Sequence, residues 1–259
     1  MTGIKITDSQ IATVGTTSTE PSLPDWYVLA RDSDFKWEED LDGSGYWHYI
    51  GTAGKVAIPH IIQGKEVTSY RDMFANTSVS GVFSNNQNVT DMSYMFDGST
   101  TTHLDLKYLD TSSVTNMRGM FKYSQAIDIN LSKFDTRNVT DMCCMFYGSQ
   151  VIHLDLFRFK TSNVTNTSYM FFKSQSQTLN ISSFDISNVT NMYAMFYDSQ
   201  AITLNLSSFD TSKVATMRAM FTYSQATTGY ARTQEEADKF NSLASKPSRL
   251  VFKVKPVAN

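Results

Sequence analysis

Large aromatic side chains recur at fixed spacing in this 259-residue chain, and they are its best candidates for contacting a ligand. Tyr147, Phe172 and Tyr197 each directly follow a Met-Phe pair and lie 25 residues apart. Tyr123 and Tyr223 occupy the next sequence position in the repeats on either side. Exposed rings supply large contact area at low entropic cost, which suits carbohydrate or protein binding. The competing interpretation is that these rings pack over one another as an outer hydrophobic belt.

A second candidate surface combines histidines with basic and aromatic residues. His103 and His153 share one sequence column, two repeats apart, and no third type of metal ligand accompanies them. We therefore interpret them as surface histidines and expect no metal site. With Lys107, Phe157 and Arg158 they would form an alternative binding surface on the outward face of the predicted strands.

The sequence shows no pattern that predicts catalysis. It contains no nucleophile elbow, phosphate-binding loop, dinucleotide fingerprint or paired-carboxylate site. The two cysteines, Cys143 and Cys144, are adjacent, which offers neither a disulfide framework nor metal-ligand spacing and indicates two free thiols. We predict a non-enzyme with no catalytic residues and no cofactor.

The aromatic positions belong to a repeat with a constant period of 25 residues. The repeated valines are Val89, Val114, Val139, Val164, Val189 and Val214. A fixed period in this range predicts a solenoid, in which each coil buries its apolar face against its neighbours. Alternating pairs such as Leu104 and Leu106 predict short parallel strands, stacked about 4.8 Å apart as one continuous sheet. The spacing of Met192, Met195 and Phe196 predicts a single helical or 3-10 turn in each coil. The fold class is a leucine-rich-repeat-like solenoid.

Four segments are predicted from the pattern. Residues 1–24, rich in Thr, Ser, Gly and Pro, form a flexible leader or docking segment; residues 25–87 form a β-rich N-terminal cap with a first atypical coil. Within that cap, the runs 26–30 and 46–50 predict strand, turn, strand. Residues 88–226 are the regular solenoid. Residues 227–259 form a helix–strand C-terminal cap, whose helix begins at a Thr233-x-x-Glu236 capping box.

Composition and charge exclude several classes of function. Apolar residues make up 41% of the chain, which excludes a disordered protein. The formal net charge of −3 gives no electrostatic footprint for nucleic acid or an acidic membrane. No apolar run approaches the roughly 20 residues of a membrane helix, and the first residues do not resemble a secretory signal. We therefore expect no nucleic-acid partner and no membrane insertion.

The repeat unit Asn-Val-Thr-x-Met-x-x-Met-Phe, followed by Ser, a Leu-x-Leu pair and Phe-Asp-Thr-Ser, resembles the BspA-like leucine-rich-repeat surface proteins of bacteria. Residues 49–68 resemble the first repeat of that family, and residues 230–241 resemble its usual tail. The family often carries Gly-Cys-Ser after Met-Phe, whereas this chain keeps only the small serine, as at Ser149 and Ser199. The resemblance implies a non-catalytic adhesion or ligand-binding role.

An adhesion-type repeat without a recognisable signal or anchor favours a bacteriophage virion protein, of the tail or fibre type, that recognises a bacterial host surface. Its partners would be a bacterial surface carbohydrate or protein, and residues 1–24 would dock on other virion proteins. The location would then be the virion or the extracellular space. The alternative is a BspA-like adhesin on the bacterial cell surface. A second alternative is an accessory domain of a wall-polymer hydrolase.

Overall fold

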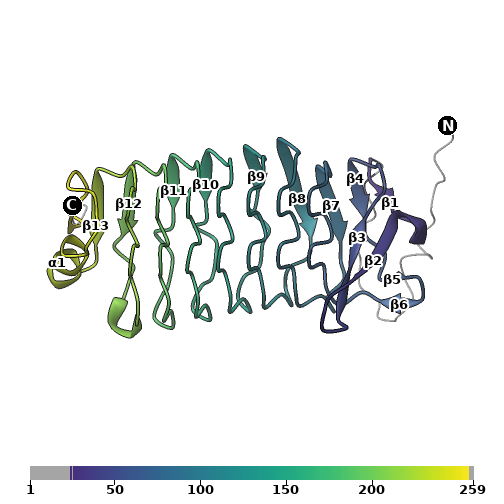
Figure 1. Ribbon diagram of the computed structural model, residues 1–259, viewed down its shortest axis with the longest axis horizontal. Coiled ribbons are helices and arrows are strands. Elements are labelled where there is room, and N and C mark those ends of the chain that lie inside the picture. The colour runs from purple at the N-terminus through teal and green to yellow at the C-terminus, as the bar shows by residue number, and fades with distance from the viewer. Residues whose placement is uncertain (1–23, 25, 257–259) are drawn as a thin grey trace.

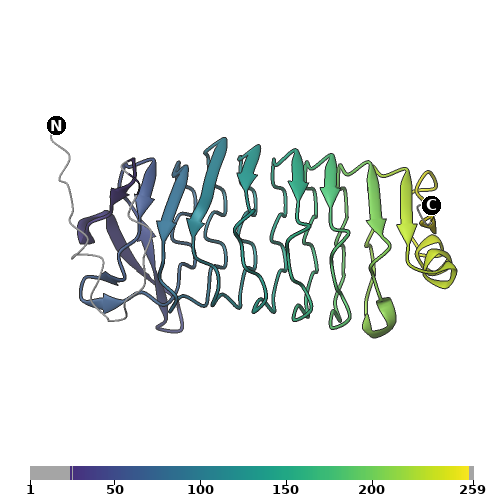
Figure 2. The same cartoon turned by 180° about the vertical axis from the view of Figure 1, so that it is seen from behind.

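The structure is a computed structural model that describes residue 24 and residues 26–256. The coils stack along one axis into an elongated solenoid, with the N-terminal cap at one end and the helix α1 (Gln234–Asn241) at the other (Figures 1 and 2). The predicted repeat solenoid is confirmed. The predicted leader lies almost wholly outside the described residues. Among the residues described, no helix is long and apolar enough to cross a membrane.

One side of the stack carries the predicted parallel strands, which are β8 (His103–Leu109), β9 (Asp128–Asn130), β10 (His153–Asp155), β11 (Thr178–Asn180) and β12 (Thr203–Leu206). Two further strands, β7 (Gly81–Ser84) and β13 (Thr228–Ala231), extend the row at its ends. With β1 (Val28–Leu29), β4 (Lys55–Ala57) and β14 (Val251–Val254), they fall into three sheets in one row, whose orders are β1-β4-β7-β8-β9, β10-β11 and β12-β13-β14. The prediction of one continuous sheet is therefore wrong. Strands of three residues form few ladder bonds. At the junctions, hydrogen bonds just before the strands hold neighbouring coils together, as from Ile152 N–H to the Ile127 carbonyl at 3.3 Å.

The opposite side of the coil does not form the predicted helical or 3-10 turn at Met-Phe. The chain makes successive β-turns there, for example from Met95 N–H to the Met92 carbonyl at 3.3 Å. Alternate N–H groups donate to the next coil, as from Phe96 to the Met120 carbonyl at 2.9 Å. Left-handed residues such as Tyr94, with φ of 55°, prevent a helix from propagating. This hydrogen-bonded ladder of turns joins neighbouring coils as the strands do on the other side.

The core runs the whole length of the solenoid as columns of identical side chains. Phenylalanines from successive Met-Phe pairs stack with ring centroids 5.4 to 5.9 Å apart. These buried rings are Phe74, Phe96, Phe121, Phe146, Phe171, Phe196 and Phe221. The serine after each turn, such as Ser149, is also fully buried, since only a small residue fits this bend. Burial of repeated apolar columns between coils is the main stabilising term.

The N-terminal cap differs in pairing from the prediction. The antiparallel hairpin joins β2 (Phe35–Glu39) to β3 (Gly45–Tyr49). The run at 26–30 contributes instead β1 (Val28–Leu29), which pairs in parallel with β4 (Lys55–Ala57) of the main sheet. A short second hairpin joins β5 (Ile61–Ile62) to β6 (Lys65–Glu66). The β2–β3 hairpin is favoured because its cross-strand aromatic rings pack, with Trp37 and Trp47 centroids 5.1 Å apart.

The C-terminal cap closes the other end of the core. Thr233 is the N-cap of α1, and its hydroxyl oxygen accepts a hydrogen bond from Glu236 N–H at 3.2 Å. The Glu236 carboxylate accepts from Thr211 N–H of the preceding coil at 3.0 Å, which ties the helix to the solenoid. After α1, β14 (Val251–Val254) pairs with β13. Phe240 and Phe252 contact the ring of Phe221 at 5.9 and 4.9 Å and so cover the last coil.

Candidate interaction surface

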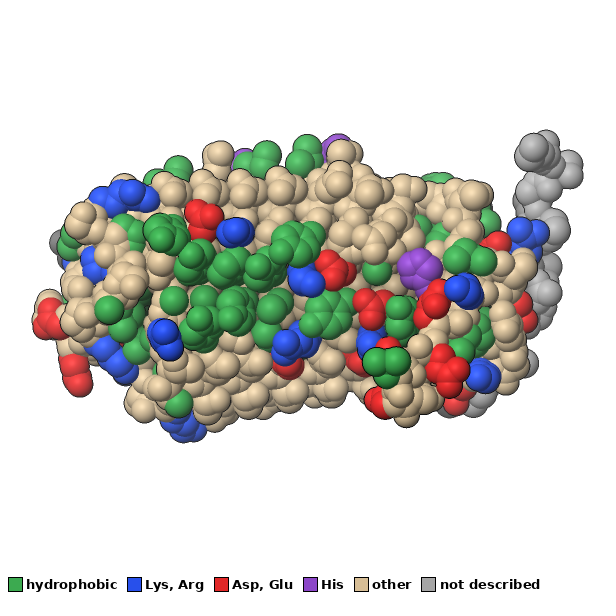
Figure 3. All heavy atoms as spheres, in the orientation of Figure 1, with side chains coloured by type: hydrophobic (Ala, Val, Ile, Leu, Met, Phe, Trp, Pro, Cys, Tyr) green, Lys and Arg blue, Asp and Glu red, His purple; other side chains and the backbone are tan. Residues whose placement is uncertain are grey.

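The structure brings all five predicted aromatic residues together on the turn side of the solenoid. Two further tyrosines complete the cluster, which we call the aromatic ribbon. Its members are Tyr123, Tyr147, Tyr169, Phe172, Tyr193, Tyr197 and Tyr223. Hydrophobic side chains form a band along this face of the molecule (Figure 3). The ribbon therefore follows the solenoid axis across five successive coils.

The centre of the ribbon is a stack of three parallel rings. Tyr147 and Phe172 have centroids 4.5 Å apart with planes inclined by 13°, and Phe172 and Tyr197 are 4.6 Å apart at 10°. Both faces of Phe172 are therefore covered by its neighbours. All three side chains are half-buried. The stack presents ring edges and tyrosine hydroxyl groups to the outside. The three rings therefore pack against one another and are still partly accessible.

The two end rings differ from the central stack. Tyr123 lies at 77° to Tyr147 and is 51% exposed, while Tyr223 lies at 88° to Tyr197 and is 64% exposed. An exposed end ring offers more surface to a ligand than a ring stacked on both faces. The ends are thus the most accessible aromatic surfaces of the ribbon.

Tyr169 and Tyr193 were not among the predicted ligand-binding residues, although Tyr193 lies outside the inward columns of the repeat. Tyr169 contacts Phe172 at 5.6 Å and Tyr193 at 5.1 Å, so a second row of rings lies beside the central stack. The two tyrosines occupy adjacent sequence columns, so no single column revealed them. Their position relative to the Met-Phe pair could have revealed them, because both lie within the three residues before such a pair and so belong to the same turn of the coil.

A glycine in the next coil makes room for the first ring of the ribbon. Gly148 has φ of +62°, and a Cβ atom there would lie 2.6 Å from Cδ1 of Tyr123. Gly119 plays the same part for Tyr94, where the nearest ring atoms would lie 2.4 Å away. Glycine suits these positions for two reasons. It adopts the left-handed backbone conformation without strain, and its lack of a side chain permits close approach of a ring.

Charged groups flank the ribbon without giving it a strong net charge. The Lys122 ammonium lies 5.4 Å from the ring centre of Tyr123 and 3.2 Å from the Asp97 carboxylate. Lys173 lies 5.7 Å from the ring centre of Phe172. Burial raises the pKa of Tyr147 to about 12, so its hydroxyl group stays protonated at neutral pH. The ribbon is therefore an apolar surface with neutral hydrogen-bonding hydroxyls, flanked by Lys173 and by the ion pair of Lys122 and Asp97.

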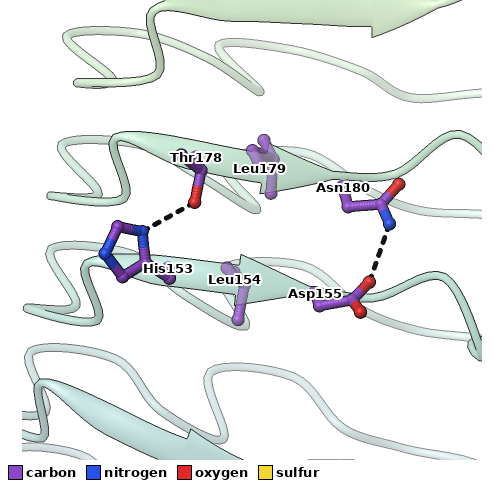
Figure 4. Close-up of a pocket in the computed structure, with 6 residues that line it drawn as sticks. All are labelled: His153, Leu154, Asp155, Thr178, Leu179 and Asn180. Atoms are coloured by element: carbon purple, nitrogen blue, oxygen red, sulfur yellow. Dashed lines mark hydrogen bonds between the residues drawn. The ribbon is translucent and has the colours of Figure 1, made fainter.

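The alternative sheet surface is largely occupied by hydrogen bonds between its own side chains. His153 Nδ1 lies 2.8 Å from Thr178 Oγ1, and Asn180 Nδ2 donates to Asp155 Oδ1 at 2.8 Å (Figure 4). The depression between β10 and β11 is shallow and open. His103 bonds in turn to its neighbour Thr102 at 3.0 Å.

The other members of this surface do not form a comparable cluster. The Lys107 ammonium lies 4.6 Å from the ring centre of Tyr108, and Arg158 is exposed. Phe157 is 57% exposed. An Asp155 oxygen caps the backbone by accepting from Phe157 N–H at 3.1 Å. Of the five candidate residues on this surface, Phe157 is the one phenyl ring, whereas the seven rings of the ribbon are linked by a continuous chain of contacts.

No group of three or more His, Cys, Asp or Glu side chains within residues 26–256 is placed to hold a metal ion. Cys143 is buried and Cys144 is half-buried, and both are free thiols. A second aromatic cluster, also missed from sequence, joins Tyr27, Phe83 and Tyr108 on the outer face of the first sheet. These rings pack β1 onto β7 and β8 and have a structural role.

This geometry defines a repeat solenoid protein with a cluster of partly exposed aromatic rings on one face. The chain belongs to the family described as "Mycoplasma protein of unknown function, DUF285", which matches residues 68–180 and 152–232. The matched region contains the whole aromatic ribbon. No curated protein and no solved structure matches the chain. The family is not a known enzyme family, and together with the repeat fold it suggests a surface or adhesin-like protein.

Proposed function

We propose that this protein is a non-catalytic adhesion module that binds a macromolecular partner through the aromatic ribbon. The observation that supports the proposal is the continuous contact of seven half-buried or exposed rings on one face. Tyrosine-rich surfaces with apolar bodies and polar tips are typical of binding sites. Because the rings support one another, little side-chain entropy is lost when a partner binds.

The orientation of the rings favours a protein partner on a bacterial surface. Sugars bind aromatic residues mainly by lying against ring faces, and both faces of Phe172 are covered. Ring edges and hydroxyl groups instead suit the mixed apolar and polar surface of a protein. A carbohydrate would find better access at the exposed ends, Tyr123 and Tyr223.

We propose a bacterial cell-surface location for the module, and the description of its family, which names the bacterial genus Mycoplasma, supports a bacterial protein. The virion assignment, with residues 1–24 docked on other virion proteins, is the second candidate, and it rests on sequence reasoning alone. Antibody labelling of intact cells and of released phage particles separates the two. Label confined to particles would reject the cell-surface placement.

The direct test replaces Tyr147, Phe172 and Tyr197 together with Ser and measures binding of the labelled protein to intact bacterial cells. We expect at least tenfold weaker binding, about 1.4 kcal/mol or more, because central aromatic residues dominate interface energies. The matched control replaces His103, His153 and Phe157 with Ser on the sheet side and should bind as the parent protein does. If the control variant loses binding and the ribbon variant keeps it, the sheet surface is the binding site.

Two treatments of the cells identify the class of partner. Protease treatment should abolish binding if the partner is a protein, whereas periodate oxidation of sugars should leave it unchanged. The reverse result would assign a carbohydrate. Incubation of the protein with wall glycans tests the hydrolase alternative, which released glycan fragments would support.

A further inference from the structure

The two cysteines form a close sulfur pair beside the ribbon. Cys143 Sγ and Cys144 Sγ lie 3.2 Å apart, within hydrogen-bonding distance for sulfur. Cys143 is buried, while Cys144 is half-buried in the turn that carries Tyr147. Tyr147 N–H donates to the Cys144 carbonyl at 3.0 Å. Both sulfurs therefore point to the same side of one turn, although consecutive side chains in an extended strand would diverge.

The surroundings of the pair favour a thiolate on Cys143. The Ser168 hydroxyl donates to Asn166 Oδ1 at 2.7 Å and lies 3.3 Å from Cys143 Sγ. The positive charge of Arg118, which forms a 3.7 Å ion pair with Asp141, also acts on Cys143. The hydrogen bond with Cys144, with a smaller effect of Arg118, lowers the pKa of Cys143 below the ordinary value of a thiol, against the raising effects of burial and of Asp141. The pKa of the Cys144 thiol is raised, because the thiol shares its proton in the hydrogen bond with Cys143 and because it is desolvated. One sulfur is thus prepared as a nucleophile and the other as a proton donor.

We infer that Cys143 and Cys144 are a redox-active vicinal dithiol that hydrogen peroxide converts to an intramolecular disulfide. The Cys143 thiolate attacks one peroxide oxygen, the O–O bond breaks, and hydroxide leaves, so that Cys143 becomes a sulfenic acid. The Cys144 sulfur then attacks the Cys143 sulfur and forms the S–S bond. The sulfenic hydroxyl leaves with the Cys144 proton as water. Overall, two thiols and one peroxide give one disulfide and two waters, with two electrons passing from sulfur to oxygen.

The backbone makes this disulfide easy to reverse. Consecutive Cα atoms are about 3.8 Å apart, whereas disulfides usually join Cα atoms separated by about 4.4–6.8 Å. The peptide between the two cysteines is also fixed by the turn ladder, with Cys144 N–H bonded to the Ser168 carbonyl at 3.0 Å and the Cys143 carbonyl bonded to Gly119 N–H at 2.8 Å. Strained disulfides have high reduction potentials and are the labile ones. The pair is therefore a reversible oxidation site and not a structural cross-link.

The test uses the whole reduced protein and counts its thiols after treatment with hydrogen peroxide. Because the chain has two cysteines, thiol labelling in denaturant reports on this pair alone. We expect both thiols to disappear together, without dimers on a non-reducing gel, and both to return with dithiothreitol. Four results would each overturn the inference. The first three are loss of only one thiol, loss of both thiols that dithiothreitol does not reverse, and formation of a disulfide-linked dimer. The fourth is survival of both thiols in peroxide that is sufficient to oxidise free glutathione.

Two single variants assign the roles of the sulfurs. Cys144→Ser removes the resolving thiol, so Cys143 should stop at a sulfenic acid that dimedone traps. Cys143→Ser removes the thiolate, so Cys144 should keep its thiol under the same treatment. Equal oxidation of the two variants would contradict the assignment of Cys143 as the nucleophile.

Discussion

The rings of Tyr147 and Phe172 lie closer together, at 4.5 Å between centroids, than the core rings of Phe146 and Phe171, at 5.9 Å. Each pair joins the same two coils, and the rings are nearly parallel in both, with planes inclined by 13° in the outer pair and 4° in the core pair. The distance between the ring centroids of the outer pair is close to the spacing of about 4.8 Å between neighbouring strands of a solenoid. The backbone repeat thus builds a preformed aromatic surface outside the core.

The neighbours Phe171 and Phe172 give a matched test of core and surface roles. Phe171→Ala should lower the free energy of unfolding by about 3–5 kcal/mol, because the side chain is fully buried in the core. Phe172→Ala should cost less, on the order of 1–3 kcal/mol, from the loss of two stacked ring contacts. Urea unfolding followed by circular dichroism measures both. Equal losses would show that the ribbon is part of the core.

Gly148→Ala tests how the backbone positions Tyr123. The new methyl group must displace the Tyr123 ring, and alanine adopts the left-handed conformation at a cost of about 1–2 kcal/mol. We expect a loss of stability of that order and weaker partner binding. Gly54→Ala is the control, since its nearest neighbour would lie 3.6 Å away and its backbone is not left-handed. A stability change no larger than that of the control would contradict this role of Gly148.

Glu236 connects the terminal helix to the last coil, and two substitutions separate its hydrogen bond from its charge. Glu236→Ala should cost about 1–3 kcal/mol, because it leaves the buried N–H of Thr211 without its acceptor. Glu236→Gln keeps an oxygen for Thr211 and loses only the ion pair with Arg232, whose side chain is 43% exposed. It should therefore cost distinctly less. Chemical denaturation of the two variants measures the difference, and identical losses would indicate that the ion pair dominates.

The lowered pKa of Cys143 predicts how peroxide oxidation depends on pH. The thiolate is the reactive form, and an ordinary cysteine with a pKa of about 8.5 loses most of its thiolate between about pH 8 and pH 7. A lowered pKa keeps the thiolate present at the lower pH. The rate of thiol loss should therefore change little over this interval. A decrease that parallels free glutathione would contradict the prediction.

The fold was predictable because most of its inward positions repeat at a constant period, with few exceptions such as Thr167 in the column of Met142 and Met192. Met145 and Phe146 are buried like their counterparts in the other coils, so periodicity alone defined the architecture. The conformation of the turns was not predictable, because Tyr94 and Ala194 adopt positive φ without the glycine that usually signals it. Hydrogen bonds to the neighbouring coils stabilise that conformation, and a local pattern does not show them.

The candidate site was predicted in part for the same reason. Tyr147, Phe172 and Tyr197 repeat in one column, and a solenoid must bring such residues together. Tyr169 and Tyr193 join them through contacts between different columns, which depend on side-chain rotamers. The sequence also left open whether the rings were packed or exposed, and the stacking geometry shows that they are both.

The most direct test of the central claim measures chemical protection of the ribbon in the unmodified protein. Tetranitromethane nitrates accessible tyrosines, and peptide mapping reports each one with and without bound cells. If the aromatic ribbon is the binding surface, Tyr123 and Tyr223 are nitrated in the free protein and protected when the protein is bound to cells. Tyr230 on the sheet side is then nitrated equally in the free and the bound protein. Unchanged nitration of Tyr123 and Tyr223 on saturating amounts of cells would contradict it.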